Sequence, residues 1–172
     1  MDVEGKHYRT IWVESTLVKA IDQSKLPHLF EILEFRTAKE VADAIKHMQV
    51  RGAGLIGAAA GYGMYLAALN NESLEEAAQM LKATRPTAVN LFTSLARMKK
   101  VANESSTKSV LDIKKDLFTE AIKIHTEDKE SCRNIGKFGS EFIKDGMGIL
   151  THCNAGGLAT ADYGTALAVM FS

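Results

Sequence analysis

The sequence predicts a mainly α-helical domain that begins with a small β element and is followed by one strand–turn–helix unit. Three observations support this fold class. β-Branched and aromatic residues gather before residue 37, apolar residues recur at helical spacing from about residue 37 to 143, and an apolar run with several glycines follows residue 145. We therefore expect an N-terminal, mostly helical domain over residues 1–145 and the start of a second domain over residues 146–172.

The composition is that of a globular protein with a buried core. Of the 172 residues, 46% are apolar and 24% are charged, and the formal net charge is zero. A neutral chain has no overall attraction for nucleic acid or for an anionic membrane, so we expect neither as a partner. Two cysteines and a polar N-terminus that does not resemble a signal peptide favour a reducing, cytoplasmic location.

The predicted strands lie in the first 35 residues. Residues 7–17 are rich in aromatic and β-branched side chains and predict one or two short strands; an ordered arm packed on the helices is the alternative. A turn is expected over residues 21–27, because the residue before Pro27 avoids helical geometry. Alternating apolar and polar residues predict a third strand within residues 28–35.

The helical region begins with a capping box. Thr37 is a good N-cap, and Glu40 stands three residues later, where its carboxylate can accept from the N-cap backbone. The helix should extend from Thr37 to Val50, with an apolar face made by Val41, Ala44, Ile45 and Met48.

A second helix is expected over residues 55–69, the most apolar stretch of the chain. Its glycines and alanines suit a tightly packed helix better than a membrane span, which needs about 20 strongly apolar residues. Further helices are expected from a Ser73 cap over residues 74–83, and from residue 86 or 87, with Pro86 suited to the first turn, to residue 102. Residues 110–126 and 128–143 form either two helices or one bent helix.

A short strand and a helix are expected near the end of the sequence. Met147–Leu150 is an apolar run typical of a buried strand, and residues 158–170 have helical spacing. Cys153 then lies on the turn between strand and helix, where free backbone N–H groups bind anions and acidify thiols. A single strand needs neighbours for its backbone groups, so the remaining strands must lie elsewhere.

Arg51 and the following Gly52-Ala53-Gly54 form the first candidate site. The first turn of the next helix leaves N–H groups unpaired, and Arg51 adds a planar donor that matches phosphate geometry. This arrangement can hold a sugar phosphate without a metal. The alternative is an arginine near a helix C-terminus followed by a helix-breaking glycine.

Arg85 and Cys153 are the other candidates. Arg85 also precedes a helix start, so two arginines could converge on one anion, although surface arginines are common. Cys153 is a candidate low-pKa thiolate or proton shuttle, or else a buried structural cysteine. His152 should point away from Cys153, and the spacing of His152, Cys153 and Cys132 is not that of a metal site. We expect neither a metal nor a cofactor.

Together these motifs resemble the family of 5-methylthioribose-1-phosphate isomerases, which share a superfamily with the regulatory subunits of eukaryotic initiation factor 2B and with ribose-1,5-bisphosphate isomerase. The matching segments are Arg-Gly-Ala at 51–53, Thr-Arg-Pro-Thr-Ala-Val-Asn-Leu at 84–91, Thr-His-Cys-Asn-Ala-Gly at 151–156 and Leu-Ala-Thr at 158–160. Their order and spacing agree with the family over nearly the whole chain.

The resemblance implies an aldose–ketose isomerase of methionine salvage that converts 5-methylthioribose 1-phosphate to 5-methylthioribulose 1-phosphate. It implies that Arg51, Gly52, Ala53 and Arg85 bind the substrate, largely its phosphate, and that Cys153 lies at the reacting carbons. It also implies a homodimer, and it makes residues 146–172 the first strand and helix of a Rossmann-like α/β domain.

The sequence departs from the family pattern in two places. Gly54 replaces a proline that usually follows Arg-Gly-Ala, and the family's catalytic aspartate, in a downstream Gly-Ala-Asp-Arg motif, has no match here. Asp162 does not occupy that position. We therefore expect this polypeptide alone to be inactive as an isomerase. Two other functions remain: a regulatory subunit of the initiation factor 2B type that binds a sugar phosphate or nucleotide, and a ribose-1,5-bisphosphate isomerase.

Overall fold

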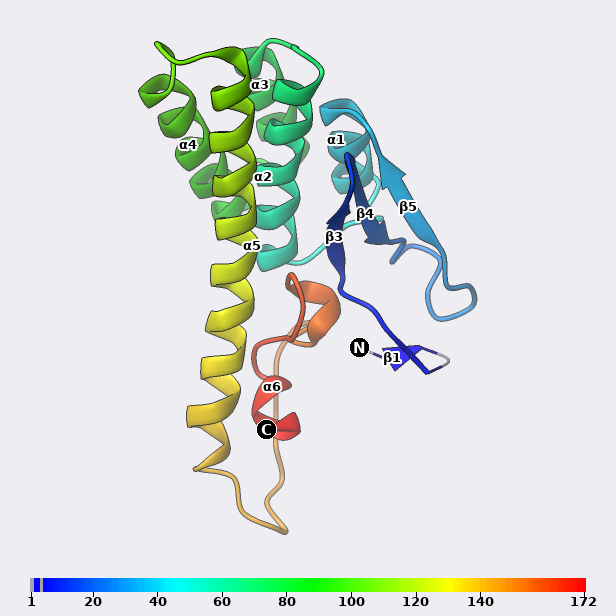
Figure 1. Cartoon of the computed structure of the whole chain (residues 1–172). Helices are drawn as coiled ribbons and strands as arrows, with labels where there is room; N and C mark the ends of the chain where they lie inside the picture. Colours follow the sequence, from blue (N-terminus) through cyan, green and yellow to red (C-terminus); the bar gives the residue numbers. More distant parts are fainter. Residues whose placement is uncertain (1, 4) are drawn as a thin grey trace.

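The computed structural model describes residues 2–3 and 5–172. It contains a bundle of helices with a small antiparallel sheet packed against one side, and a long helix that extends beyond the bundle (Figure 1). The five main helices are α1 (Ala38–Lys46), α2 (Ala53–Leu69), α3 (Leu74–Thr84), α4 (Val89–Glu104) and α5 (Val110–Ser140).

Helix α2 is the centre of the bundle, and every residue from Leu55 to Ala68 is buried. Its glycines explain how neighbours surround it so closely. Gly57 faces α4 at Asn90, Gly61 faces α5 at Ile124, and Gly63 faces α3 at Leu81. The buried, small-residue helix is therefore a packing element. No helix in the described part of the chain has the length and apolar character needed to cross a membrane.

Local capping chemistry sets the starts of α1 and α3. The capping box at Thr37 is confirmed: Glu40 N donates to Thr37 Oγ1 over 3.2 Å, and Thr37 N donates to Glu40 Oε2 over 3.0 Å. The Ser73 cap is also confirmed, because its hydroxyl accepts from Glu76 N. In contrast, α4 begins at Val89, so the expectation that Pro86 stands in its first turn is wrong.

The small β element is confirmed as a three-stranded antiparallel sheet in the order β3-β4-β5, although β4 lies mostly beyond the predicted range 7–17 and ends at the first residue of the expected turn. Strands β3 (Ile11–Glu14) and β4 (Leu17–Ile21) form a hairpin, and β5 (Ile32–Phe35) pairs with β4 in the register Val18 opposite Phe35. Two shorter strands, β1 (Asp2–Val3) and β2 (Lys6–His7), form a separate pair. The sheet buries Ile11, Val18 and Phe35 against the helices.

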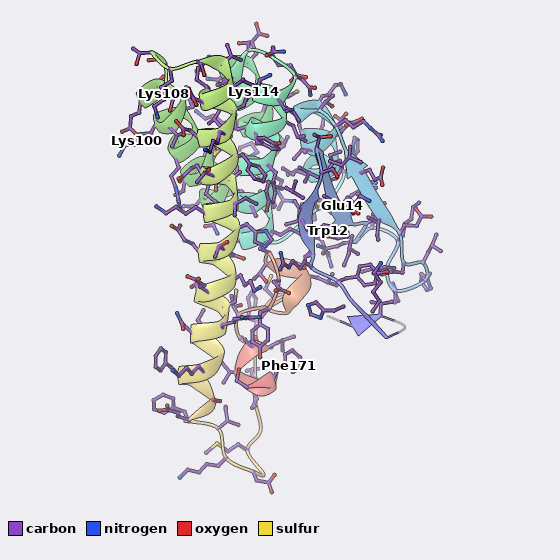
Figure 2. All side chains as sticks on the ribbon, in the orientation of Figure 1. Trp12, Glu14, Lys100, Lys108, Lys114 and Phe171 are labelled. Atoms are coloured by element: carbon purple, nitrogen blue, oxygen red, sulfur yellow. The ribbon has the colours of Figure 1, made fainter. Side chains whose placement is uncertain are left out.

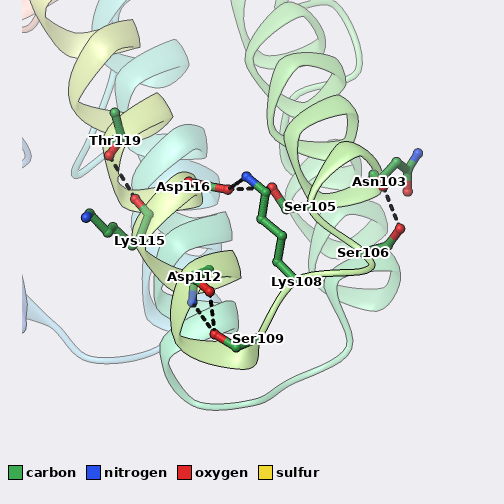
Figure 3. Close-up of polar contacts among 9 residues, drawn as sticks. All are labelled: Asn103, Ser105, Ser106, Lys108, Ser109, Asp112, Lys115, Asp116 and Thr119. Carbon is green, nitrogen blue, oxygen red and sulfur yellow. Dashed lines mark hydrogen bonds and ion pairs between the residues drawn. The ribbon is translucent and has the colours of Figure 1, made fainter.

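Polar contacts close the connection between α4 and α5 (Figure 3). Asp116 Oδ2 accepts from Ser105 Oγ and from Lys108 Nζ, each over 2.6 Å, and the Lys108 hydrogen bond lowers the pKa of Asp116. Ser109 then caps α5 by accepting from Asp112 N. Further along α5, Lys114, which is labelled in Figure 2, donates to the carbonyl of Leu69, the last residue of α2. These contacts fix where α5 starts beside α2.

Helix α5 is one continuous helix of 31 residues, which resolves the choice between two helices and one. Its first part packs on α2 and α4, and its second part extends beyond the bundle beside the last residues of the chain (Figure 1). There, Gly136 and Gly139 contact Ala168 and Val169 of the short helix α6 (Ala168–Phe171). The segment after α5 therefore returns along this helix and brings Ala159 against Gly52 at the N-terminus of α2 (Figure 1).

The strand expected at Met147–Leu150 and the helix expected over residues 158–170 are not formed in this structure. Met147–Leu150 forms no strand, and Leu150 is 97% exposed. The physical reason is that no other strand in the described residues lies beside this segment to pair with it. Residues 158–170 contain only part of the short turn η1 (Gly157–Ala159) and α6, separated by a loop that an isolated bridge between Gly156 and Gly164 closes.

Candidate functional site

A cavity of about 440 Å³ lies where the N-terminus of α2, the start of α4 and the loop after residue 152 meet. All five site residues expected from the sequence line it: Arg51, Gly52, Ala53, Arg85 and Cys153. These residues come from three separate parts of the chain. The fold therefore brings the three sequence motifs around one space.

The N-terminus of α2 forms one wall of the cavity. Gly52 is the N-cap, with φ +106°, and no side chain caps the helix. The first-turn N–H groups of α2 are thus left without helical partners and carry partial positive charge. Because Gly52 has positive φ and contacts the backbone of Ala159, only glycine fits this position without strain.

Two arginines flank this helix end. Arg51 is exposed just before the N-cap, and Arg85 is the half-buried C-cap of α3. Arg85 also donates to the sulfur of Met48, another residue of the cavity wall. In the described part of the chain neither guanidinium forms an ion pair with a carboxylate. Both are therefore available for an anionic ligand at the helix N-terminus.

Cys153 faces the cavity with an unusual backbone. Its φ is +64°, a left-handed conformation that costs a residue with a side chain on the order of 1–3 kcal/mol and is concentrated at functional sites. The thiol-bearing residue is exposed, so the interpretation of Cys153 as a buried structural cysteine is wrong. Cys132 is the buried one, and burial raises the pKa of its thiol.

The loop that carries Ala159 is fastened from the β side by two polar side chains that sequence analysis missed. Thr10 Oγ1 donates to the carbonyl of Gly157 over 2.7 Å, and Gln23 Nε2 donates to the carbonyl of Leu158 over 2.7 Å. Both side chains are buried. No local motif marks them, because each partner is more than a hundred residues away along the chain.

Helix α5 fastens the same loop from the other side. Asp128 Oδ2 accepts from Ala161 N over 2.7 Å, and Lys129 forms a 3.4 Å ion pair with the buried Asp162. Sequence analysis missed Asp128 and Lys129 as well, because charged residues on an amphipathic helix normally form its solvated face.

His125 lies one helical turn before Asp128 and is a buried neutral group. Its ring is 4% exposed, lies 5.9 Å from the ring of Tyr62, and has no hydrogen-bond partner for either nitrogen in the described part of the chain. Burial, aided by the positive charge of Arg9, lowers the pKa of His125 to about 4. His125 is therefore uncharged at neutral pH.

The fold and the site define a helical domain with an arginine-lined cavity at the N-terminus of its central helix and a thiol beside it. The chain belongs to the initiation factor 2 subunit family, whose model matches residues 32–170. This family assignment covers every part of the cavity wall.

Curated relatives are named as isomerases. The chain is 45% identical over 174 residues to methylthioribose-1-phosphate isomerase from Thermoanaerobacter sp. (strain X514), covering 96% of this chain and 50% of the relative. It is 48% identical over 163 residues to the enzyme of the same name from Acetivibrio thermocellus, covering 90% of this chain and 48% of the relative. The chain thus spans about half the length of the curated relatives it matches.

Solved structures give the same picture. The 5-methylthioribose 1-phosphate isomerase from Pyrococcus horikoshii OT3 superimposes with a TM-score of 0.89 at 44% identity, over 95% of this chain and 48% of the other. Translation initiation factor eIF-2B subunit delta from A. fulgidus superimposes with a TM-score of 0.82 at 42% identity, over 96% and 51%. The resemblance to both branches of the superfamily is therefore shown in sequence and in fold.

Proposed function

We propose that this chain forms the phosphate-binding part of an aldose–ketose isomerase site for 5-methylthioribose 1-phosphate. The observation that carries the proposal is the single cavity lined by both arginines, the N-terminus of α2 and Cys153. The names of relatives at 45–48% identity supply the substrate.

In this proposal Arg51 and Arg85 hold the phosphate together with the N–H groups of the first turn of α2. Charged, forked donors and a helix N-terminus are the usual means of binding phosphate without a metal. The phosphate on the anomeric oxygen blocks simple ring opening, so an acid must protonate the ring oxygen. Holding the phosphate fixes the sugar so that C1 and C2 lie toward the thiol side of the cavity.

Cys153 acts at the reacting carbons. The isomerisation takes a proton from C2 and returns one to C1, so it needs no oxidant and no net change in charge. A thiol with an exposed, left-handed backbone position in the cavity is suited to this transfer. The acid for the ring oxygen would come from the half of the relatives' length that this chain does not span.

We further propose that residues 146–172 begin a second, Rossmann-like domain after the helical domain of residues 1–145. Met147–Leu150 would become a strand only when neighbouring strands pair with it. A homodimer in the cytoplasm is the assembly and location that this proposal implies.

The direct test is calorimetric titration of the 172-residue chain with 5-methylthioribose 1-phosphate. Binding that inorganic phosphate competes for, and that Arg51→Ala weakens, supports the proposal; Arg36→Ala, an exposed arginine outside the cavity, is the matched control. The chain alone should show no isomerase turnover. Absence of binding would refute the proposed site, and turnover by the isolated chain would refute the division of labour between the two halves.

A regulatory subunit is the second candidate, favoured by the TM-score of 0.82 to the eIF-2B delta subunit. A ribose-1,5-bisphosphate isomerase would share the same phosphate grip. Adenosine monophosphate and ribose 1,5-bisphosphate in the same titration separate these alternatives, because a regulatory site should prefer a nucleotide and the third candidate a bisphosphate.

A further inference from the structure

Asp128 joins two walls of the cavity that are distant in sequence. One oxygen of its carboxylate, Oδ2, accepts from Ala161 N over 2.7 Å. The same carboxylate lies directly against Gly54 in the first turn of α2. Ala161 itself is fully buried. Asp128 is thus placed between the helix N-terminus and the loop that follows Cys153.

The contact with Gly54 leaves no room for a side chain there. A Cβ added to Gly54 would lie 2.8 Å from Cγ of Asp128 and 2.9 Å from its Oδ2, and would overlap Oδ1. The carboxylate therefore fills the space that a residue larger than glycine would occupy. Gly54 and Ala159 both line the cavity, so the size of this filled space contributes to the separation of its walls.

The charge environment of Asp128 differs from that of Asp116, Glu120 and Glu127 on the same helix. Asp116 pairs with Lys108, and Glu120 and Glu127 both pair with Arg97. Asp128 forms no ion pair in the described part of the chain, and burial raises its pKa. A half-buried carboxylate without a cation is unfavourable for folding. The hydrogen bond that the Asp128 carboxylate accepts from Ala161 N attaches the loop to α5.

We infer that Asp128 is a positioning residue for the cavity, which holds the loop of residues 157–161 at a fixed distance from the N-terminus of α2. Through this loop Asp128 sets the spacing between the arginine side of the cavity and the Cys153 side. The effect on a sugar phosphate rests on the proposed function, whereas the attachment of the loop does not.

Cys132 provides a reporter of the loop that is independent of any ligand. It lies one helical turn after Asp128, is 1% exposed, and contacts the Thr160 side chain and the Gly164 backbone. Cys153 is exposed. In the native chain a thiol reagent such as Ellman's reagent should therefore modify Cys153 quickly and Cys132 slowly. Detachment of the loop should expose Cys132 without global unfolding.

The experiment measures the rate of each thiol in native buffer for Asp128→Ala, Asp128→Asn and the control Glu130→Ala, an exposed carboxylate on the same helix. We expect Asp128→Ala to speed modification of Cys132 at least tenfold. Asp128→Asn keeps an oxygen acceptor for Ala161 N, so its rate should stay within threefold of the original, as should that of Glu130→Ala. A Cys132 rate in Asp128→Ala within twofold of the original would overturn the inference.

A second variant applies if Asp128→Ala does not fold. Gly54→Ala keeps the carboxylate but displaces it, so it should expose Cys132 in the same way. Where both single variants fold, the double variant should show a Cys132 rate no higher than Asp128→Ala alone, because the clash and the bond are one interaction. Additive increases would contradict a shared mechanism.

Ligand binding separates this inference from the proposed function. Asp128→Ala should bind 5-methylthioribose 1-phosphate at least tenfold more weakly than the original chain and Glu130→Ala. If the original chain does not bind this ligand, the proposed function fails, while the Cys132 rates still decide whether Asp128 holds the loop. If the original chain binds and Asp128→Ala binds equally well, the inference fails and the proposed function stands.

Discussion

Gly52 and Ala159 contact each other through their backbones, although more than a hundred residues separate them in the sequence. A Cβ on Gly52 would lie 2.5 Å from the carbonyl oxygen of Ala159 and 2.7 Å from its carbonyl carbon. Such distances are not compatible with a side chain at position 52. The helix N-cap and the loop after Cys153 are therefore in direct backbone contact at the edge of the cavity.

Gly52→Ala should destabilise the chain strongly. The substitution combines positive φ, which costs on the order of 1–3 kcal/mol, with a clash against a fastened backbone. Gly146→Ala is the matched control, because Gly146 has φ +83° but nothing within 4 Å of an added Cβ. Urea unfolding measures both free energies. Equal losses in the two variants would show that the loop moves aside freely.

Arg51→Ala and Arg85→Ala should each weaken binding of 5-methylthioribose 1-phosphate. A hydrogen bond to a charged group contributes about 1.5–3 kcal/mol, which corresponds to roughly 10- to 150-fold in affinity. The loss should be smaller at high salt, where screening already weakens the original complex. Titration at two ionic strengths tests this, and a salt-independent loss would indicate that the arginine acts by packing.

Kinetics separates the roles of Arg51 and Cys153. In a chimera that joins this chain to the unmatched half of the Thermoanaerobacter relative, Arg51→Ala should mainly raise KM and Cys153→Ala should mainly lower kcat. Under the proposed function, the phosphate is held equally before and during the reaction, whereas the thiol acts only as hydrogen moves. A Cys153→Ala chimera with unchanged kcat would exclude Cys153 from the chemistry.

Because of His125, the free energy of unfolding should fall as the pH is lowered from 6.5 to 4. Its pKa is lowered to about 4 in the folded chain, so in this range the unfolded chain binds more protons. The shifted pKa of His125 changes the free energy of unfolding by about 3 kcal/mol in total. This stability is fully present above pH 6.5 and is lost by pH 4. Arg9, Lys129 and Asp162 are the charged groups that act on this ring, and Asp162 alone opposes the shift.

Unfolding free energies of His125→Leu across this range isolate the effect. Between pH 6.5 and pH 4, the difference in unfolding free energy between His125→Leu and the original chain should change by about 2–3 kcal/mol, which is most of the contribution of His125. For His28→Gln, at an exposed position, this difference should change little with pH. The raised pKa of Asp128 acts in the opposite direction, because a folded chain that binds more protons gains stability as the pH falls. A pH-independent difference for His125→Leu would mean that His125 is solvated.

Thr37→Ala should cost about 1 kcal/mol through loss of the capping box. Thr119→Ala is a control of the same chemistry in a different place. Thr119 is exposed within α5, and its hydroxyl donates to the carbonyl of Lys115 (Figure 3). That carbonyl already accepts a backbone hydrogen bond within the helix. Its replacement should be neutral or slightly stabilising, because alanine is the better helix former. Thermal unfolding compares the two.

Local chemistry explains why most of the fold could be predicted. The side chains of Thr37 and Ser73 cap the helices that follow them, so these helix starts can be predicted from local sequence. The strands of the sheet pair with strands that are close to them in the sequence. The strand predicted at Met147–Leu150 does not form, because it depends on partners that are distant in sequence. Its apolar pattern permits a strand, but a strand also requires partners, and the described residues provide none.

The candidate site could be predicted motif by motif, but its assembly could not be obtained from spacing. Arg51, Arg85 and Cys153 were each identified from local helix starts and glycines, and only the fold shows that they share one cavity. Thr10, Gln23 and Asp128 carry no local signal, because their roles depend on backbone groups more than thirty residues away. Residues that support a loop are in general harder to predict than residues that line a cavity.

The Gly52–Ala159 contact also has a consequence for the order of folding. Helices form quickly because their contacts are between residues close in sequence. The contact between residues 52 and 159 can form only after the segment that follows α5 has folded back along this helix. The cavity should therefore be among the last features to form and the first to open. A bound sugar phosphate would then slow unfolding and leave the refolding rate almost unchanged, as expected for contacts absent from the transition state.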